Sequence, residues 1–336
     1  MARSRKLPSA LPVSPWLKQG QFVNGALTTA AAIKAAKLDW EVTLEPAGYQ
    51  RAHKFMSVTG DRYIIRVGAD GNDVVLGNAT TSYHPLQNTN AFAFIDDVVD
   101  DPSIAVINSA GYINDGKQVW VQLQIPALTF DAVPGDTIQD HLTIFNSHAA
   151  DRSVVIIDTP IRVISQSTAN RSVRKSMSIR HTSGMLSRMR KGADIIAAEI
   201  KFFNEWRLEV KGMVAHKVTQ QDAIQFALDI IQSDRTSQGG KAATTIDELQ
   251  TKQRAIAERL MELIESGQGT EIKGVRGTGW GLYSAVLEYV DHYSLEATGR
   301  PSTRSIEDRR LQFMLFGNGA LMKDRALAWL LNRMEA

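Results

Sequence analysis

Short runs of β-branched and aromatic residues alternate with turn residues over positions 40–158. "RYIIRV" and "NDVVLG" flank the turn "GADG" at 68–71, and "SIAVINSAGYI" and "KQVWVQLQIP" flank "NDG" at 114–116. Asp-Gly supplies the positive φ angle that a tight connection requires, so each pair predicts a β-hairpin. "HLTIFNS" and "RSVVIID", around residues 149–151, predict a third hairpin.

Three other segments of this region have a different pattern. "ALTTAAAIKAAKLDW" (26–40) predicts a helix, and a second predicted helix covers 88–101 with Asn88 as its N-cap. In "TPIRVISQSTANRS" (159–172) the Thr-Pro pair indicates an N-cap and a first helical residue. The alternating Ile161 and Val163 are equally consistent with a strand, and both interpretations stay open.

After Gly184 the apolar period changes to three and four, which predicts a long amphipathic helix. Its apolar face is formed mainly by Met185, Met189, Ala193, Ile196, Ile200, Phe203 and Val210. Thr219 with Asp222 resembles a capping box, and Thr245 with Glu248 predicts a second box that opens a helix ending at Gly267. Residues 280–334 supply two or three more helices.

These elements predict an α+β fold in which antiparallel hairpins with helices are followed by an α-helical C-terminal part. The predicted units are an N-terminal arm (1–25), flexible or clamped, an α+β domain (26–182) and a mainly α-helical region (183–336). Three prolines among the first 15 residues mark the arm. At 336 residues the chain is long enough to bury a sizeable core.

The amino-acid composition excludes several kinds of site and segment. Hydrophobic residues make up 43% and charged residues 22%, and the formal net charge is only +2. The absence of cysteine excludes disulfides, thiolate nucleophiles and Cys-based metal centres, and it fits a cytosolic protein. No apolar run approaches the roughly 20 residues that span a bilayer, and the N-terminus lacks the apolar core of a secretory signal.

Catalytic and metal-binding patterns are weak. The seven histidines are scattered, and none has metal-ligand spacing on a clear helix face. The four aspartates of "FIDDVVDD" favour a solvated helix face over a cation site. "GVRGTGWG" (274–281) lacks the spacing of a phosphate loop, which leaves a flexible approach to a helix, or a contact of Arg276 and nearby amides with a phosphate. We therefore expect no cofactor and do not favour an enzyme.

The strongest local signal is positive charge in the middle of the chain. No Asp or Glu occurs between Asp158 and Asp194. A solvated basic helix face is the ordinary explanation of a charge run, but this run extends over several predicted elements and lacks interleaved acids. Such a segment attracts polyanions. The predicted phosphate contacts are Arg171, Arg174, Lys175, Arg180, Arg188, Arg190 and Lys191. His181 and Trp280 are predicted to add hydrogen bonding and stacking, although Trp280 also suits a core position among the C-terminal helices.

Several ordered blocks resemble the phage/plasmid-like proteins of domain-of-unknown-function family 932. They include "LGNATTSYHPLQNTNAFAFIDDVV", "SAGYINDGKQVWVQLQIP", "DTPIRVISQSTANRS", "SIRHTSG" and "GTGWGLYSAVLEYVDHY", and the resemblance extends over roughly 35–333. Members usually have Cys where this chain has Ser165, and usually Ala at Gly279. The resemblance implies a bacteriophage, prophage or plasmid protein that acts in a bacterial cytoplasm. The layout is also loosely similar to phage single-strand annealing proteins of the Erf and Red-beta type, an analogy that does not establish function.

Two functional hypotheses follow. In the first, the chain binds nucleic acid, most plausibly single-stranded DNA, and assists recombination or replication as a homo-oligomer without contact to a membrane. In the second, it is a protein-interaction module, such as an inhibitor of a host defence nuclease or a scaffold protein. A catalytic site assembled from dispersed residues stays open as a third possibility.

Overall fold

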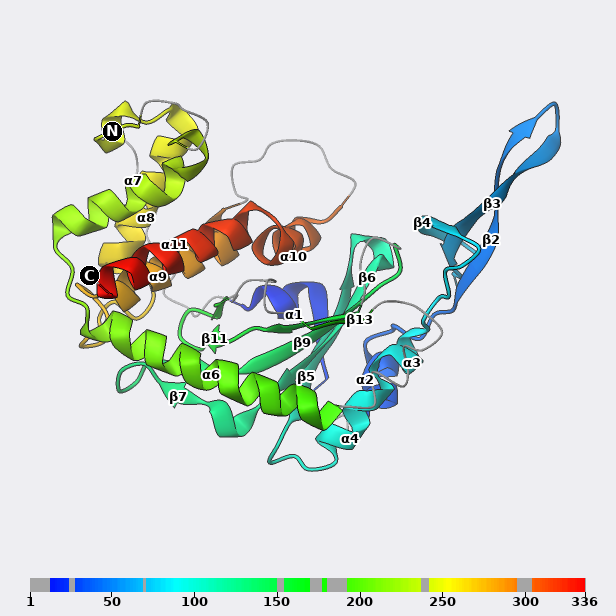
Figure 1. The fold of residues 1–336 in the computed structure, drawn as a ribbon, viewed down its shortest axis with the longest axis horizontal. Coiled ribbons are helices and arrows are strands. Elements are labelled where there is room, and N and C mark those ends of the chain that lie inside the picture. Colours follow the sequence, from blue (N-terminus) through cyan, green and yellow to red (C-terminus); the bar gives the residue numbers. More distant parts are fainter. Residues whose placement is uncertain are drawn as a thin grey trace.

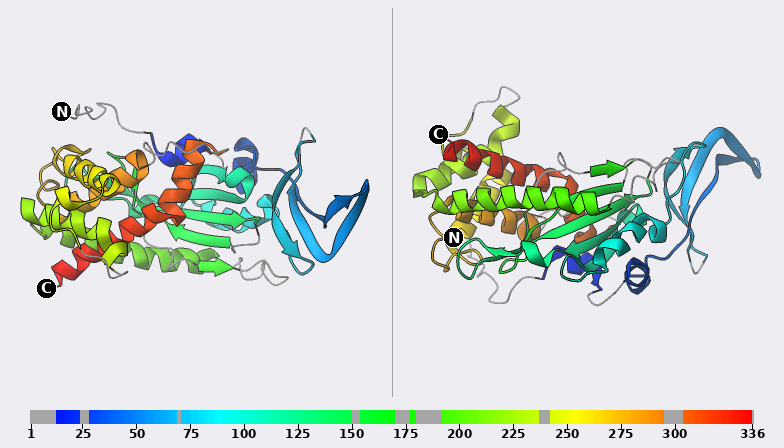
Figure 2. Two further views of the ribbon diagram at one scale, coloured as in Figure 1. Left: turned by 90° about the horizontal axis from the view of Figure 1, so that it is seen from above. Right: turned by 60° about the horizontal axis from the view of Figure 1, so that its bottom comes forward.

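The computed structural model describes residues 13–23, 28–68, 71–149, 154–169, 177–179, 192–236, 242–294 and 304–335. It shows an α+β protein in which a central antiparallel sheet lies between helices, and a long β-ribbon projects from one end (Figure 1). Two further views, turned by 90° and by 60° about the horizontal axis, also show the β-ribbon projecting from the rest of the protein (Figure 2).

The central sheet has six strands in the order β1-β5-β6-β9-β10-β13. Its strands are β1 (Gly20–Phe22), β5 (Val106–Ile113), β6 (Gln118–Gln124), β9 (His141–Ser147), β10 (Val154–Asp158) and β13 (Met177–Ile179). The predicted hairpins around 114–116 and 149–151 are confirmed by the antiparallel pairing of β5 with β6 and of β9 with β10, although residues 150–153 lie outside the described residues. Asn114, Asp115 and Gly116 all have positive φ, as the tight turn requires.

Alternating residues of this sheet face two cores. Trp120 and Phe145 point to one face, where they join Trp16 and the C-terminal helices, while Val121 and Ile144 point to the other. The second face is covered by α2 (Thr29–Ala35), α3 (Asn88–Phe92) and α4 (Asp96–Val99). A sheet buried on both sides explains why its strands read as nearly continuous apolar runs.

The helical prediction for 88–101 needs one correction. A short 3₁₀ turn (Ala93–Ile95) separates α3 from α4, and the N-cap is Gln87. Asn88 is instead the first helical residue, and its buried amide donates to the Leu38 carbonyl at 2.7 Å. Tertiary burial therefore takes the side chain away from the capping role that its residue type favours.

A smaller four-stranded sheet has the order β12-β11-β8-β7. Its strands are β7 (Phe130–Asp131), β8 (Thr137–Gln139), β11 (Ile161–Arg162) and β12 (Ser167–Thr168). Pro160 therefore precedes a strand, and the helical alternative for 159–172 is wrong for the described part. Ile161 pairs with both Gln139 and Thr168, so non-local pairing decides the conformation.

The C-terminal region is helical, as predicted. Its helices are α6 (Gly192–Ala215), α7 (Gln220–Thr236), α8 (Thr251–Ser266), α9 (Gly279–Glu288), α10 (Ile306–Phe316) and α11 (Asn318–Met334). Residues 185–191 of the predicted long helix lie outside the described residues. The apolar cluster that holds these helices also contains residues of the central sheet, so sheet and helices share one core.

The two predicted capping boxes have different outcomes. Asp222 accepts hydrogen bonds from the amide and hydroxyl of Thr219, and Thr219 Oγ1 accepts from the Asp222 amide at 3.2 Å, which confirms the first box. In the second, Thr245 makes no side-chain cap and precedes only a 3₁₀ turn (Ile246–Glu248). Glu248 accepts from the Thr244 amide at 2.8 Å, one residue earlier than predicted.

Part of the predicted N-terminal arm is clamped. Residues 15–19 form α1 (Pro15–Gln19), and β1 follows directly and pairs with β5. Trp16 is buried, and its indole N–H donates to Thr168 Oγ1 at 3.0 Å. Residues 1–12 and 24–25 lie outside the described residues.

The projecting part is a three-stranded sheet. We call this sheet the arm from here on, and it is distinct from the N-terminal segment 1–25. It comprises β2 (Val42–Arg51), β3 (Lys54–Arg66) and β4 (Val74–Thr80) in the order β2-β3-β4. The predicted hairpin at 68–71 joins β3 to β4 and is confirmed by the pairing of Arg66 with Val74. A small apolar cluster of Val42, Ile64 and Leu76 holds the base of the arm together.

Candidate nucleic-acid interface

Most of the predicted phosphate contacts lie outside the described residues. These are Arg171, Arg174, Lys175, Arg180, His181, Arg188, Arg190 and Lys191. The described strand β13 lies between them in sequence and forms an edge of the central sheet. Ile179, the last described residue before the second half of the basic segment, pairs with Val154 at the start of β10.

The arm reaches the same end of the central sheet. A Cβ atom added to Gly77 of β4 would lie 2.9 Å from the carbonyl oxygen of Ala149, so the two backbones are in close contact. Ala149 belongs to the connection between β9 and β10, close in sequence to Val154. The point at which the chain leaves β13 and the base of the arm are therefore at one end of the sheet (Figure 1).

The two remaining predicted contacts have different environments. Arg276 is exposed. Trp280 is fully buried in the core, and its indole N–H donates to Asp136 Oδ2 at 2.8 Å, which matches the core alternative and leaves no ring face for a base. The amides of Gly279 and Gly281 donate to the His216 carbonyl and to Thr278 Oγ1, so both are satisfied within the protein.

Trp280 belongs to a buried ionic cluster between the small sheet and the helices. Arg162 Nε lies 2.7 Å from Asp136 Oδ1, Arg162 Nη2 lies 2.9 Å from Asp136 Oδ2, and Arg162 Nη1 donates to the Gln268 carbonyl at 2.7 Å. Both charged side chains are almost completely buried. Nearby, burial raises the pKa of Glu288, whose carboxylate accepts the Gln268 amide.

A second buried ion pair joins α11 to β12 of the small sheet. Lys323 Nζ is 2.5 Å from Asp291 Oδ1 and donates to the Thr168 carbonyl at 2.7 Å, while Asp291 Oδ2 accepts the Thr168 amide at 2.6 Å. Asp291 lies in a π-helical turn (Tyr289–Tyr293) that extends α9. Burial lowers the pKa of Lys323, although the Asp291 carboxylate opposes this shift. We call the two pairs together the ionic junction.

The junction is suited to holding the sheet and the helices together. Its donors and acceptors are directed at each other and at backbone groups, which satisfies charges that burial would otherwise make costly. Among the described residues, no group of three or more metal-ligating side chains occurs. The junction therefore connects the sheet and the helices inside the protein. Because its charged side chains are buried, a large ligand can contact only other residues, on the outer surface.

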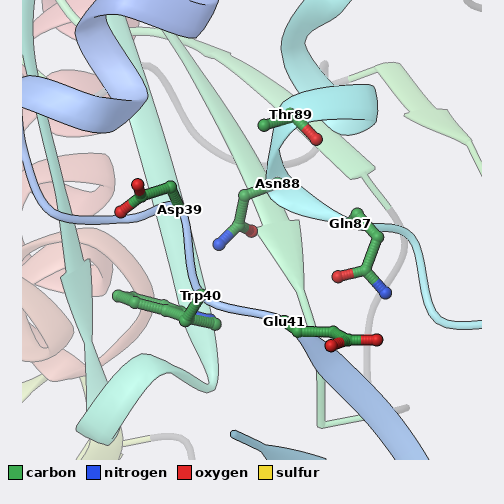
Figure 3. A pocket seen from close by; sticks show the side chains of 6 residues that line it. All are labelled: Asp39, Trp40, Glu41, Gln87, Asn88 and Thr89. Atoms are coloured by element: carbon green, nitrogen blue, oxygen red, sulfur yellow. The ribbon is translucent and has the colours of Figure 1, made fainter. Parts of the chain in front are cut away.

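A depression lies at the base of the arm. Its larger part, about 840 Å³, lies between the arm and β1 and β5, and a neighbouring part of about 310 Å³ is lined by Asp39, Trp40, Glu41, Gln87, Asn88 and Thr89 (Figure 3). Gln87 exchanges two hydrogen bonds with the backbone of Val42, at 2.8 and 3.0 Å. The side-chain amide of Gln87 therefore fixes the start of β2 and helps to hold the arm in place.

Cation–π contacts fix the other side of the arm base. The Arg66 guanidinium lies 5.0 Å from the ring centre of Trp40 and 5.8 Å from that of Tyr112. The two rings are in edge-to-face contact at 5.4 Å. Because Tyr112 belongs to β5, this stack joins the base of the arm to the central sheet.

Beyond this base the arm is a two-stranded ribbon. β4 ends opposite Asp61, so the part of β2 and β3 that pairs from Gly48 to Lys54 has no third strand. We call residues 48–58 the distal ribbon. Its side chains include the exposed Tyr49 (54%), Phe55 (60%), Met56 (44%) and Val58 (42%). No Gly, Asn or Asp marks the turn of this ribbon, because its tip is Ala52-His53.

These features define an α+β protein with a buried ionic junction and an exposed β-ribbon. The chain belongs to the family described as Domain of unknown function (DUF932), whose model matches residues 75–314. The expected family membership is thereby confirmed, and β2 and β3 precede the matched range. No curated protein and no solved structure matches the chain. Among the described helices, none has both the length and the apolar character needed to cross a bilayer.

Proposed function

We propose that this protein binds nucleic acid, with single-stranded DNA as the favoured ligand, and assists recombination or replication of a phage or plasmid in a bacterial cytoplasm. The observation that carries the proposal is the segment without Asp or Glu between Asp158 and Asp194. Each Lys or Arg that meets a phosphate releases condensed counterions, which favours binding without any sequence readout.

The location of the flanking residues supports this proposal. Ile179 lies at the end of the central sheet that carries the arm, and the arm adds Arg51 and Lys54 on an exposed ribbon. Cations from separate parts of the chain can thus serve one extended polyanion. Pairing of complementary strands needs no covalent chemistry, only a positively charged surface that holds one backbone and leaves bases accessible. A homo-oligomer would extend that surface along the strand.

Binding of a fluorescent oligothymidylate to the full chain tests the proposal. The variant carrying Arg174→Ala, Lys175→Ala and Arg180→Ala is expected to bind at least about tenfold more weakly at low salt, because it loses three phosphate contacts. A matched control replaces the exposed Lys34, Lys211 and Lys273 by alanine and should bind like the wild type. Absence of binding by the wild type at low salt would contradict the proposal.

A second candidate function is a protein-interaction module, such as an inhibitor of a host nuclease or a scaffold protein. The exposed apolar side chains of the distal ribbon favour it, because such groups often mark protein contacts. Capture from a bacterial lysate, with and without nuclease treatment, separates the two candidates. A protein partner that survives nuclease supports the second function, and a partner that disappears supports the first.

A further inference from the structure

We propose that one face of the distal ribbon is a second nucleic-acid contact, on which a base of a single strand stacks against Tyr49 while Arg51 and Lys54 hold the adjoining phosphates. This inference rests on the proposed function and names a site separate from the basic segment. It follows from the register, exposure and charge of residues 48–58.

Folding does not account for the ribbon. A two-stranded ribbon with solvent on both faces is marginally stable, and every residue from Tyr49 to Thr59 is exposed. The apolar cluster of the arm lies entirely in its base. Tyr49 and Met56 therefore contribute little to the core, and their exposure indicates a surface that meets another molecule.

The register gathers cations and an aromatic ring on one face. Tyr49 pairs with Met56 and Arg51 pairs with Lys54, and residues two apart in a strand share a face. Tyr49, Arg51, Lys54 and Met56 therefore lie on the same side. An aromatic ring next to two cations is the combination used by surfaces that bind single strands, where bases stack and phosphates meet positive charge.

Charge favours a polyanion on this face. No Asp or Glu occurs between Glu45 and Asp61, while Arg51, His53 and Lys54 lie in that interval. Within the described part of the chain, no ion pair involving Arg51 or Lys54 occurs. The ribbon thus repeats, on a smaller scale, the charge pattern of the segment between Asp158 and Asp194.

The opposite face is occupied differently. A Cβ atom added to Gly48 would lie 2.5 Å from Phe55 Cζ, so the Phe55 ring covers the glycine backbone. The hydroxyl of Tyr63 donates to the Gly48 carbonyl at 3.2 Å and ties the same segment to the base. Phe55 therefore stabilises the ribbon itself, which leaves Tyr49 as the aromatic ring that is available on the cationic face.

The test uses the full chain, a labelled oligothymidylate and an abasic deoxyribose-phosphate oligomer of equal length. Tyr49→Leu is expected to weaken binding to oligothymidylate about tenfold and to leave binding to the abasic oligomer unchanged, since only bases stack. Tyr49→Phe keeps the ring and should bind like the wild type. Arg51→Ala with Lys54→Ala should lower the slope of log K against log salt by about 1.4 on both probes.

Gln50→Ala, on the other face, is the matched control and should change neither quantity. The inference is overturned if Tyr49→Leu and the double variant bind both probes as the wild type does. In that case the proposed function still holds, provided that the variant of Arg174, Lys175 and Arg180 is weakened. If the wild type binds neither probe at low salt, both the inference and the proposed function fail.

Discussion

The ionic junction and the distal ribbon both contain two cations, and they use them in opposite ways. Arg162 and Lys323 are buried, and each lies within 2.7 Å of a carboxylate oxygen. Arg51 and Lys54 are exposed on a ribbon without acidic residues. A buried charge without a partner is costly, so the stability of the fold depends on the ion pairs of the junction cations. Solvated cations add little to stability. The ribbon cations are therefore available for an external ligand.

The largest expected effect is in the junction. Arg162→Met leaves the buried Asp136 carboxylate without its main partner and should lower the free energy of unfolding by about 3–5 kcal/mol. Arg51→Met, its counterpart on the ribbon, should change this free energy by no more than about 0.5 kcal/mol. Urea denaturation of both variants measures the difference. Equal losses in the two variants would remove the distinction between the regions.

The second effect compares a buried histidine of the central sheet, His141, with an exposed histidine of the ribbon, His53. Burial lowers the pKa of His141 from 6.5 to about 4. Below pH 6.5 this histidine is protonated in the unfolded chain but stays neutral in the folded chain. The free energy of unfolding therefore falls as the pH drops from 6.5 to about 4. This histidine should account for about 3 kcal/mol of that loss. Glu288, whose pKa is raised, contributes in the opposite direction and is common to all variants.

Unfolding experiments across this pH range on two variants isolate the contribution. His141→Gln should show a smaller loss on acidification than the wild type. His53→Gln, at the exposed tip of the ribbon, should follow the wild-type curve. Parallel curves for His141→Gln and the wild type would contradict the effect of burial.

The smallest effect is at the tip of the ribbon. Ala52 and His53 both have positive φ angles, of 48° and 63°, in a turn that favours Asn-Gly. Ala52→Asn with His53→Gly should relieve about 1 kcal/mol of local strain. Amide hydrogen exchange in the ribbon should then slow by about fivefold, and the free energy of global unfolding should rise by no more than about 1 kcal/mol. Unchanged or faster exchange at Arg51 and Lys54 would show that the turn is not strained.

The two regions also differ in how far the sequence predicts them. The hairpins at 68–71 and 114–116 were predictable, because Asp-Gly specifies the turn locally. The capping box of Thr219 and Asp222 was predictable for the same reason, since both partners lie within one helical turn. The ionic junction was not, because Asp136, Arg162 and Trp280 meet only through tertiary packing.

The distal ribbon was missed for a different reason. Its turn has no Gly or Asn, and Pro46, Gly48 and Gly60 interrupt the alternation that marks a strand. The absence of acids between Glu45 and Asp61 was the signal that could have drawn attention to it. Strand β11 was ambiguous because Pro160 suits a helix start, and because one of its pairing partners, β8, lies before β9 and β10 in the chain.

Salt dependence of single-stranded DNA binding tests the central claim most directly. The affinity of the wild type should fall steeply with salt, and Arg174→Ala, Lys175→Ala and Arg180→Ala together should reduce the slope of log K against log salt by about 2. The variant of Lys34, Lys211 and Lys273 should keep the wild-type slope. Identical slopes for all three proteins would contradict a role of the basic segment in holding a nucleic-acid backbone.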